Sequence, residues 1–228
     1  MKCFERNISF EEAVRLQKEL AKKVICRDDF EEPIRKIAGV DLGYVQGYGH
    51  AVVVVLSFPS LELIEVAEAT LPVEFPYIPG FLSFRETPVA LEAFSKLQNE
   101  PDLIFCDGQG IAHPRRFGIA CHIGILTGKP SIGVAKSILV GGFESLGTKR
   151  GDSANLVHNG EVVGVALRTK DKVQPVYVSI GHKISLSTAV ELTLRCCIKT
   201  RLPEPLKLAD KLASFRGKHK RQQRLGNR

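Results

Sequence analysis

Ile-Ala-Gly-Val-Asp-Leu-Gly at residues 37–43 and Leu-Ile-Phe-Cys-Asp-Gly-Gln-Gly at residues 103–110 decide the fold of this chain. Each begins as a short apolar run, typical of a buried strand, and each contains one carboxylate, Asp41 or Asp107. Desolvating a charge is expensive, so an aspartate at the end of a buried strand needs a partner. Two such aspartates in one small domain indicate either a shared cation or separate turn aspartates bonded to backbone amides.

The runs around these stretches predict the order of the elements. Three strand-like runs, 36–44, 50–58 and 61–70, follow one another with short turns, which predicts an antiparallel meander because parallel neighbours need a long crossover. The later predicted elements are helices at 88–97, 118–127, 187–197 and 206–214 and strands at 102–107, 131–135, 161–168 and 176–180, with one helix at 9–24 before the meander. This order predicts an α/β fold, a ribonuclease H-like mixed β-sheet flanked by helices, in which the first and fourth strands are neighbours.

Length, charge and cysteine usage bound the class of protein. A chain of 228 residues suits a single domain, and six cysteines without a C-x-x-C pair exclude a zinc framework. The longest apolar stretch, 51–58, is too short to span a bilayer, and residues 1–10 lack a signal-peptide core, so we expect a cytoplasmic protein without a membrane segment. The net charge of +7 resides after residue 210, where basic residues occur without any acidic one. We therefore predict a folded domain at 1–214 and a basic, disordered tail at 215–228.

A third carboxylate and several polar residues accompany the two aspartates. Glu86 is either a further acidic group at the same site or a favourable charge at a helix start. Oxygen ligands without a Cys/His set favour a hard cation, Mg²⁺ or Mn²⁺. His113 is a candidate for proton transfer, and Lys136, at the end of a strand, for stabilising charge on a phosphate. Each also has an ordinary interpretation, as a hydrogen-bonding loop histidine and as a surface lysine.

A proline-clamped loop and an arginine pair complete the candidates. In Phe-Pro-Tyr-Ile-Pro-Gly at 75–80, two prolines hold an exposed Tyr-Ile pair in a stiff, extended loop. Such a tip suits insertion into a base stack beside a displaced base, although a packed proline-rich turn has the same pattern. Arg115 and Arg116 are able to hold phosphates.

Four motifs in a fixed order carry a resemblance to a known family. They are Pro-Tyr-Ile-Pro-Gly-Phe-Leu-Ser-Phe-Arg-Glu at 76–86, Asp-Gly-Gln-Gly at 107–110, His-Pro-Arg at 113–115 and Ile-Gly-Val-Ala-Lys-Ser at 132–137. Together they resemble endonuclease V, the deoxyinosine-directed nuclease, over residues 12–213. The resemblance implies a ribonuclease H-like fold and a magnesium-dependent DNA repair endonuclease. Such an enzyme hydrolyses the second phosphodiester 3′ of the lesion and leaves 3′-hydroxyl and 5′-phosphate ends.

The same resemblance implies roles for individual residues. Asp41, Glu86 and Asp107 would be metal ligands and catalytic residues, with Mg²⁺ as the cofactor and Mn²⁺ able to substitute. Lys136 and His113 would support the reacting phosphate or water. The implied DNA-binding wedge is Pro76, Tyr77, Ile78 and Pro79, and the implied lesion pocket is Gly80, Leu82, Gly108 and Leu139. Some family members carry a histidine near the metal where this chain has Asp210, so the resemblance assigns Asp210 no role.

The implied partner is DNA containing deoxyinosine, bound by a monomer. An alternative is an inosine-specific endoribonuclease, since some family members prefer inosine in RNA and the 2′-hydroxyl distinguishes the substrates. A second alternative is a noncatalytic nucleic-acid-binding module, against which the intact carboxylate set argues. A third is a small-molecule phosphotransferase on the same fold, but the sequence has no nucleotide-kinase phosphate loop.

Overall fold

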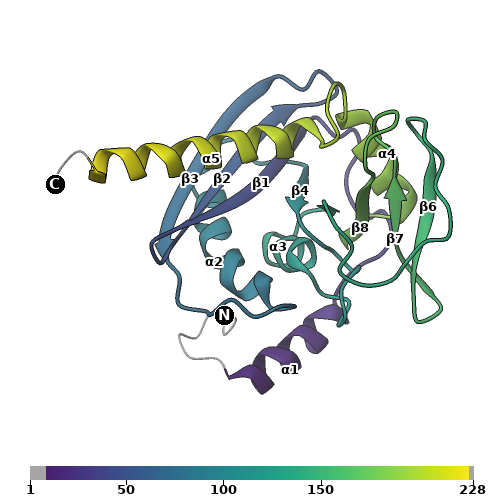
Figure 1. Ribbon diagram of the computed structural model, residues 1–228, viewed down its shortest axis with the longest axis horizontal. Coiled ribbons are helices and arrows are strands. Elements are labelled where there is room, and N and C mark those ends of the chain that lie inside the picture. The colour runs from purple at the N-terminus through teal and green to yellow at the C-terminus, as the bar shows by residue number, and fades with distance from the viewer. Residues whose placement is uncertain (1–8, 226–228) are drawn as a thin grey trace.

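A mixed eight-stranded sheet runs through the protein in the order β3-β2-β1-β4-β5-β8-β7-β6 (Figure 1). The structure is a computed structural model that describes the backbone of residues 9–225 and the side chains of residues 9–214. The strands are β1 (Lys36–Val45), β2 (Tyr48–Ser57), β3 (Leu63–Pro72), β4 (Leu103–Asp107), β5 (Ser131–Ala135), β6 (Ser153–His158), β7 (Glu161–Leu167) and β8 (Val176–His182). The helices are α1 (Phe10–Ala21), α2 (Leu82–Phe94), α3 (Ile119–Thr127), α4 (Leu186–Cys196) and α5 (Glu204–Leu225).

The strand pairing confirms the predicted topology. Strands β1, β2 and β3 form an antiparallel meander, β4 pairs in parallel with β1, and β5 pairs in parallel with β4. The first and fourth strands are therefore neighbours, with Val40 opposite Cys106. Asp41 and Asp107 each follow that pair, so both aspartates lie side by side on two central strands, where the pairing of β1 with β4 ends.

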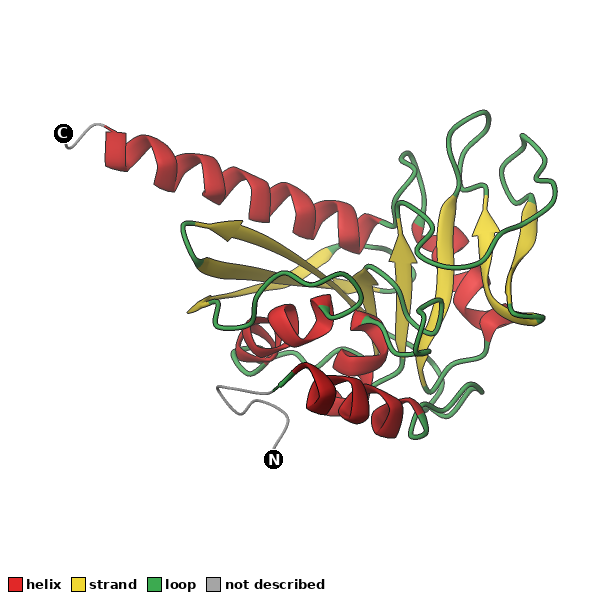
Figure 2. Ribbon diagram, turned by 60° about the horizontal axis from the view of Figure 1, so that its bottom comes forward, coloured by secondary structure: helices red, strands yellow, loops and turns green. Residues whose placement is uncertain are grey.

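Helices cover both faces of the sheet. Helix α5 lies along one face, and α1, α2 and α3 lie beyond the other (Figure 2). Strand β2 shows the cause: Val52 and Val54 pack against Ala209 and Ala213 of α5, whereas Val53 and Val55 belong to the core cluster of α2 and α3. Successive side chains of a strand point to opposite faces, so a strand that is apolar at every position is buried on both.

Strand β6, which the sequence pattern does not predict, is the outermost strand at one edge of the sheet. Only Leu156 of this short strand is buried, so the apolar alternation is weak. The signal was the Asn159-Gly160 turn, whose residues adopt φ of 56° and 79°. A two-residue turn with both φ values positive is the preferred connection of a β-hairpin.

Two helix boundaries differ from the prediction by more than three residues. Helix α2 begins at Leu82, so Glu86 and Pro88 lie within it, rather than before it and at its start as predicted. The earlier start follows from packing, because Phe81 and Phe84 are buried in one aromatic cluster with Phe75.

Helix α5 continues to Leu225, through a segment that we predicted to be disordered. Lysine, arginine, glutamine and leucine dominate 211–225 and are good helix formers, and one glycine costs only about 1 kcal/mol. Residues 226–228 of the predicted tail lie outside the described residues. Over the part of the chain that the structure describes, no helix combines the length and apolar character needed to cross a membrane.

Candidate active site

Four carboxylates and one ammonium meet at the carboxyl-terminal ends of β1 and β4. Asp41 comes from β1, Asp107 from the last position of β4, and Glu86 from α2. Helix α5 adds Asp210, whose charge raises the pKa of Asp41. The predicted trio is thus brought together by two neighbouring parallel strands and one helix packed against them.

The crowding of negative charge is visible in the pKa values. Burial, followed by the charges of Asp107 and Asp210, raises the pKa of Asp41 to about 7. Burial is also the main cause that raises the pKa of Glu86 to about 8, with contributions from Asp41 and Asp107. A positive charge bound between these carboxylates would lower their pKa values and favour their ionised forms. Carboxyl groups with perturbed pKa values of this kind cluster at functional sites.

Lys136 supplies one positive charge at this edge. Its Nζ lies 2.6 Å from Asp107 Oδ2 and 3.9 Å from Asp210 Oδ1. Partial burial lowers the pKa of Lys136, but the bond to Asp107 and the nearby aspartates raise it overall, so the ammonium stays charged. Arg201 Nη2 donates to the Lys136 carbonyl over 2.8 Å and holds the backbone there.

Tyr44 orients Glu86 from the end of β1. Its hydroxyl donates to Glu86 Oε1 over 3.1 Å, and the guanidinium of Arg85 lies 4.2 Å from the centre of the Tyr44 ring. Because Glu86 is only 7% exposed, this bond limits the directions in which its carboxylate can point. Sequence reasoning did not select Tyr44, although it stands three residues after Asp41 in the same strand.

The carboxylate oxygens of this site suit a hard divalent cation. All of the candidate ligands are carboxylate oxygens, and the raised pKa values of Asp41 and Glu86 reflect negative charge that a cation would offset. Among the described residues, no three His, Cys, Asp or Glu side chains are already arranged around one ion-sized space. Asp41, Glu86 and Asp107 are the residues whose carboxylates would hold such an ion.

The predicted wedge is a loop with one exposed tip. Tyr77 is 69% exposed between Pro76 and Pro79. Ile78, predicted to be exposed beside it, instead packs against Phe81 and Phe84. Ile78 therefore anchors the loop, while the exposed Tyr77 is free to contact a ligand.

His113 supports this loop rather than the carboxylates. Its Nδ1 accepts from the backbone N–H of Arg115 over 3.2 Å, so its Nε2 carries the proton and donates to the Gly80 carbonyl over 3.0 Å. Burial, with the nearby Arg115 charge, lowers the pKa of His113 to about 4 and keeps the ring neutral. These contacts place His113 beside Gly80, and its predicted role at the reacting phosphate or water stays a prediction.

The four predicted pocket residues occupy three loops. Gly80 (φ +79°) and Gly108 (φ +144°) adopt backbone conformations that L side chains rarely reach. Leu82 begins α2, and Leu139 is 45% exposed in the loop after β5. Gln109 Nε2 donates to the Ser137 carbonyl over 2.9 Å and joins the loops that follow β4 and β5.

The two candidate phosphate-binding arginines have separate partners. Arg116 is tied to the β6–β7 hairpin, with Nη2 2.9 Å from Glu161 Oε2 and Nη1 2.9 Å from His158 Nδ1. Arg115 instead stacks on Phe81, its guanidinium carbon 4.2 Å from the ring centre. Arg116 therefore stabilises the fold, whereas Arg115, in the loop after β4, contacts Gly80 and Phe81 at the end of the loop that carries Tyr77.

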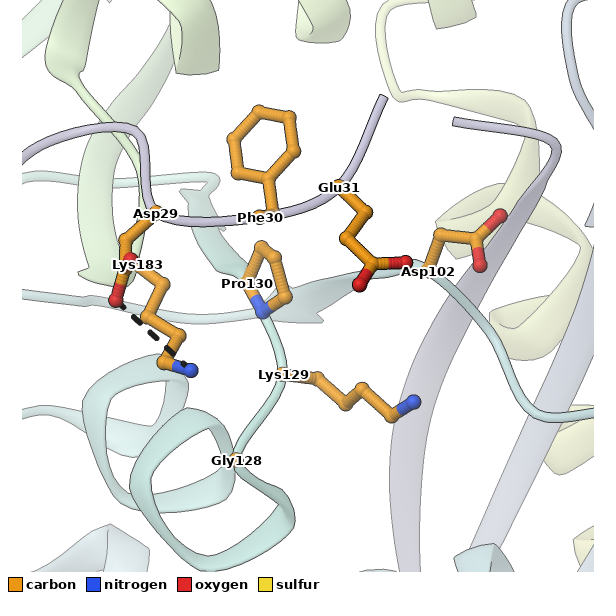
Figure 3. A pocket seen from close by; sticks show the side chains of 8 residues that line it. All are labelled: Asp29, Phe30, Glu31, Asp102, Gly128, Lys129, Pro130 and Lys183. Carbon is orange, nitrogen blue, oxygen red and sulfur yellow. Dashed lines mark ion pairs between the residues drawn. The ribbon is translucent and has the colours of Figure 1, made fainter. Parts of the chain in front are cut away.

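A polar cavity of about 560 Å³ lies at the opposite end of the central strands, near Asp102 and Pro130 (Figure 3). Its lysines already have acidic partners: Lys183 Nζ lies 3.9 Å from Asp29 Oδ2, and Lys129 Nζ lies 2.9 Å from Glu100 Oε2. Asp102 accepts from the backbone N–H groups of Arg35 and Lys36. Lys129, Lys183 and Asp102 are therefore occupied by partners within the fold. The candidate active site remains the carboxylate cluster on β1 and β4.

A ribonuclease H-like sheet with carboxylates on its first and fourth strands places this chain in the class of α/β proteins that have an acidic site between neighbouring strands. Comparison with known proteins narrows this class. The Endonuclease V family model matches residues 18–211. Endonuclease V of Trichormus variabilis is 54% identical over 211 residues, which cover 92% of this chain and 96% of that protein.

Solved structures agree with this assignment. The crystal structure of Endonuclease V from Streptomyces avermitilis superposes with a TM-score of 0.89 at 42% identity, covering 93% of this chain and 95% of that one. Endonuclease V of Ciona intestinalis, in complex with a DNA containing an inosine followed by a ribo-adenosine, superposes with a TM-score of 0.80 at 30% identity, covering 92% and 98%. The chain belongs to the Endonuclease V family.

Proposed function

We propose that this protein is a metal-dependent DNA repair endonuclease that recognises deoxyinosine, the product of adenine deamination. It hydrolyses the second phosphodiester 3′ of the lesion and leaves 3′-hydroxyl and 5′-phosphate ends. The observation that carries the proposal is that Asp41, Glu86 and Asp107 lie together with Lys136 at the central strands β1 and β4. The substrate class is supported by the Ciona intestinalis relative, which was crystallised with inosine-containing DNA.

Asp41, Glu86 and Asp107 would hold Mg²⁺, with Mn²⁺ able to substitute. When bound, the ion supplies polarisation of the phosphoryl oxygen, an activated water and a charge partner for the leaving oxygen. Tyr44 holds the carboxylate of Glu86 in place through its hydroxyl. Lys136 places a permanent positive charge beside Asp107, where negative charge grows on the reacting phosphate.

Inosine is selected by the low cost of extruding its base from the helix and by the shape of the pocket that binds it. Hypoxanthine pairs and stacks weakly, so removing it from the helix costs less than removing a normal base. Tyr77, exposed at the tip of its stiff loop, fills the space left in the stack. Backbone groups near Gly80 and Gly108 bind the edge of hypoxanthine, and the close backbone leaves no room for the 2-amino group of guanine.

Inosine-containing RNA is the second candidate substrate. One observation favours it: the nucleic acid bound to the Ciona intestinalis relative carries a ribo-adenosine directly after the inosine. A 2′-hydroxyl at that position distinguishes the two substrates. The protein acts on either strand as a monomer in the cytoplasm under this proposal.

A labelled duplex with a single deoxyinosine tests the proposal, with an undamaged duplex and a matched inosine RNA as comparisons. Cleavage is read at nucleotide resolution with Mg²⁺ and with EDTA. We expect a metal-dependent nick at the second phosphodiester 3′ of inosine and none in the undamaged duplex. Cleavage of the RNA alone would assign the protein to RNA metabolism.

The control for the metal mechanism is Asp107→Ala. This variant should bind inosine DNA in Ca²⁺ but not cleave it in Mg²⁺. Equal cleavage by the variant would overturn the metal mechanism. Binding without cleavage by the unmodified protein on every substrate would make it a noncatalytic binding module.

A further inference from the structure

Gln17 is a polar residue in the apolar face of α1 with no exposed surface. Its neighbours on that face, Ala13 and Leu20, are buried apolar residues. A primary amide has two donor hydrogens and one acceptor oxygen, and burying them without partners destabilises the fold. Since a leucine would fill this position without that cost, the amide requires an explanation.

Every part of the Gln17 amide has a partner, and each partner belongs to a loop beside the active site. Nε2 donates to the Gly80 carbonyl over 3.0 Å and to the Phe117 carbonyl over 3.3 Å. Oε1 accepts from Nε of Arg115. The opposite orientation of the amide would set its oxygen against two carbonyls, so the contacts determine the orientation. One side chain therefore joins α1, the loop that carries Tyr77 and the loop after β4.

The Gly80 carbonyl is the centre of this arrangement. Besides Gln17, it accepts from Nη2 of Arg115 over 2.7 Å and from Nε2 of His113 over 3.0 Å. Three donors on one carbonyl leave the Gly80–Phe81 peptide a single orientation. The φ of +79° at Gly80 is the backbone conformation that turns this carbonyl inward.

Apolar contacts hold α1 against the same loop. The rings of Phe10 and Phe81 have centroids 4.9 Å apart, and Ala13 packs with Phe81 and Phe84. Helix α1 takes no part in the sheet and lies at the outer side of α2 and α3 (Figure 1). Ala13 on its buried face thus supports the segment from Phe75 to Phe84, whereas Leu20 packs with Phe117 and Cys121.

We propose that Gln17 is a positioning residue that locks the Tyr77 loop in its binding conformation before nucleic acid arrives. The lock acts through the Gly80 carbonyl and the Arg115 guanidinium. A loop ordered in advance does not lose that freedom on binding, so affinity for the extruded-base complex increases. The functional part of this inference rests on the proposed function, whereas the lock itself is a property of the free protein.

The lock is measured first in the free protein. The chain has no tryptophan, so Tyr77→Trp introduces a single fluorescent reporter at the tip. Gln17→Met keeps the length of the side chain and removes the amide, and Gln17→Glu keeps the acceptor for Arg115 but loses both donors. Lys18→Met, an exposed neighbour on the same helix, is the matched control. We expect faster decay of tryptophan anisotropy in both Gln17 variants and no change in the control.

Cleavage is then measured in proteins that retain Tyr77. Under single-turnover conditions, Gln17→Met should raise the protein concentration for half-maximal inosine cleavage by about tenfold, the loss of roughly one buried hydrogen bond. The rate at saturation should stay within about threefold, because a lost positioning contact weakens binding more than chemistry. A fall in the saturated rate with unchanged half-saturation would contradict the assignment.

The outcomes separate the two proposals. Unchanged anisotropy in folded Gln17→Met and Gln17→Glu would overturn the lock whatever the nuclease assay gives. Failure of both variants to fold would make Gln17 a general folding residue and would also overturn it. Absence of inosine cleavage by the unmodified protein, together with faster anisotropy decay in the variants, would overturn the proposed function and leave the lock standing.

Discussion

Replacing Gly108 by alanine should destabilise the protein through backbone strain and through one identified contact. Gly108 directly follows Asp107 and has φ of +144°, and a Cβ added there would lie 2.7 Å from Cγ2 of Ile119. A residue forced into such a backbone conformation costs roughly 1–3 kcal/mol. Crowding a packed core position costs roughly 1–3 kcal/mol more. We therefore expect Gly108→Ala to lower the free energy of unfolding by roughly 2–6 kcal/mol.

A double-mutant cycle with Ile119→Ala separates the two contributions. Ile119 is 4% exposed, so its truncation alone costs roughly 2–5 kcal/mol. The double variant removes the clash but keeps the backbone strain. Its destabilisation in urea unfolding should be smaller than the sum of the single effects by roughly 1–3 kcal/mol.

The same cycle bears on function. Among the described residues, and apart from the chain neighbours of Gly108, only Ile119 lies within 4 Å of the added Cβ, so the loss of inosine cleavage in Gly108→Ala should come from displacement of the loop. Relief of the clash should then restore part of the single-turnover rate in the double variant. A Gly108→Ala protein within about 0.5 kcal/mol of the unmodified protein, with normal cleavage, would refute the argument.

Three further changes test other parts of the site. Tyr44→Phe removes the hydroxyl that donates to Glu86, so the Mg²⁺ concentration for half-maximal cleavage should rise roughly 10–100-fold; an unchanged requirement would contradict the orienting role. Tyr77→Ala should weaken binding of inosine DNA, but change stability by no more than about 0.5 kcal/mol because the side chain is exposed; normal binding would exclude a wedge. Burial lowers the pKa of His122 to about 3, below its unfolded value. The contribution of the neutral ring to the free energy of unfolding is therefore complete above pH 6.5, and it is lost as the pH falls because the unfolded chain binds the proton first. Between pH 7 and 4.5 the unmodified protein should lose roughly 2–3 kcal/mol more stability than His122→Leu in urea unfolding, and parallel losses would show that His122 is protonated in the fold.

The strands and the order of the elements follow from local pattern. Apolar runs of strand length, short turns and the Asp107-Gly108 punctuation define β1, β2, β4 and β5 to within a residue or two. The β6 strand was missed because one buried residue, Leu156, makes too weak a pattern, although the Asn159-Gly160 turn marks the hairpin. The start of α2 was misplaced because the burial of Phe81 and Phe84 determines it, and burial is not a local property.

By itself, the sequence determined the chemistry available to this protein: oxygen ligands, a basic group at a strand end, a stiff aromatic tip and glycines beside it. Only the tertiary structure decided which of these groups work together. Lys136 joins the carboxylates, His113 does not, and Gln17 reaches partners 63 and 100 residues away. The physical reason is the distance along the chain over which each kind of interaction acts. Periodicity and turn chemistry act over a few neighbouring residues, whereas a site depends on strand register and helix packing, which bring distant residues together.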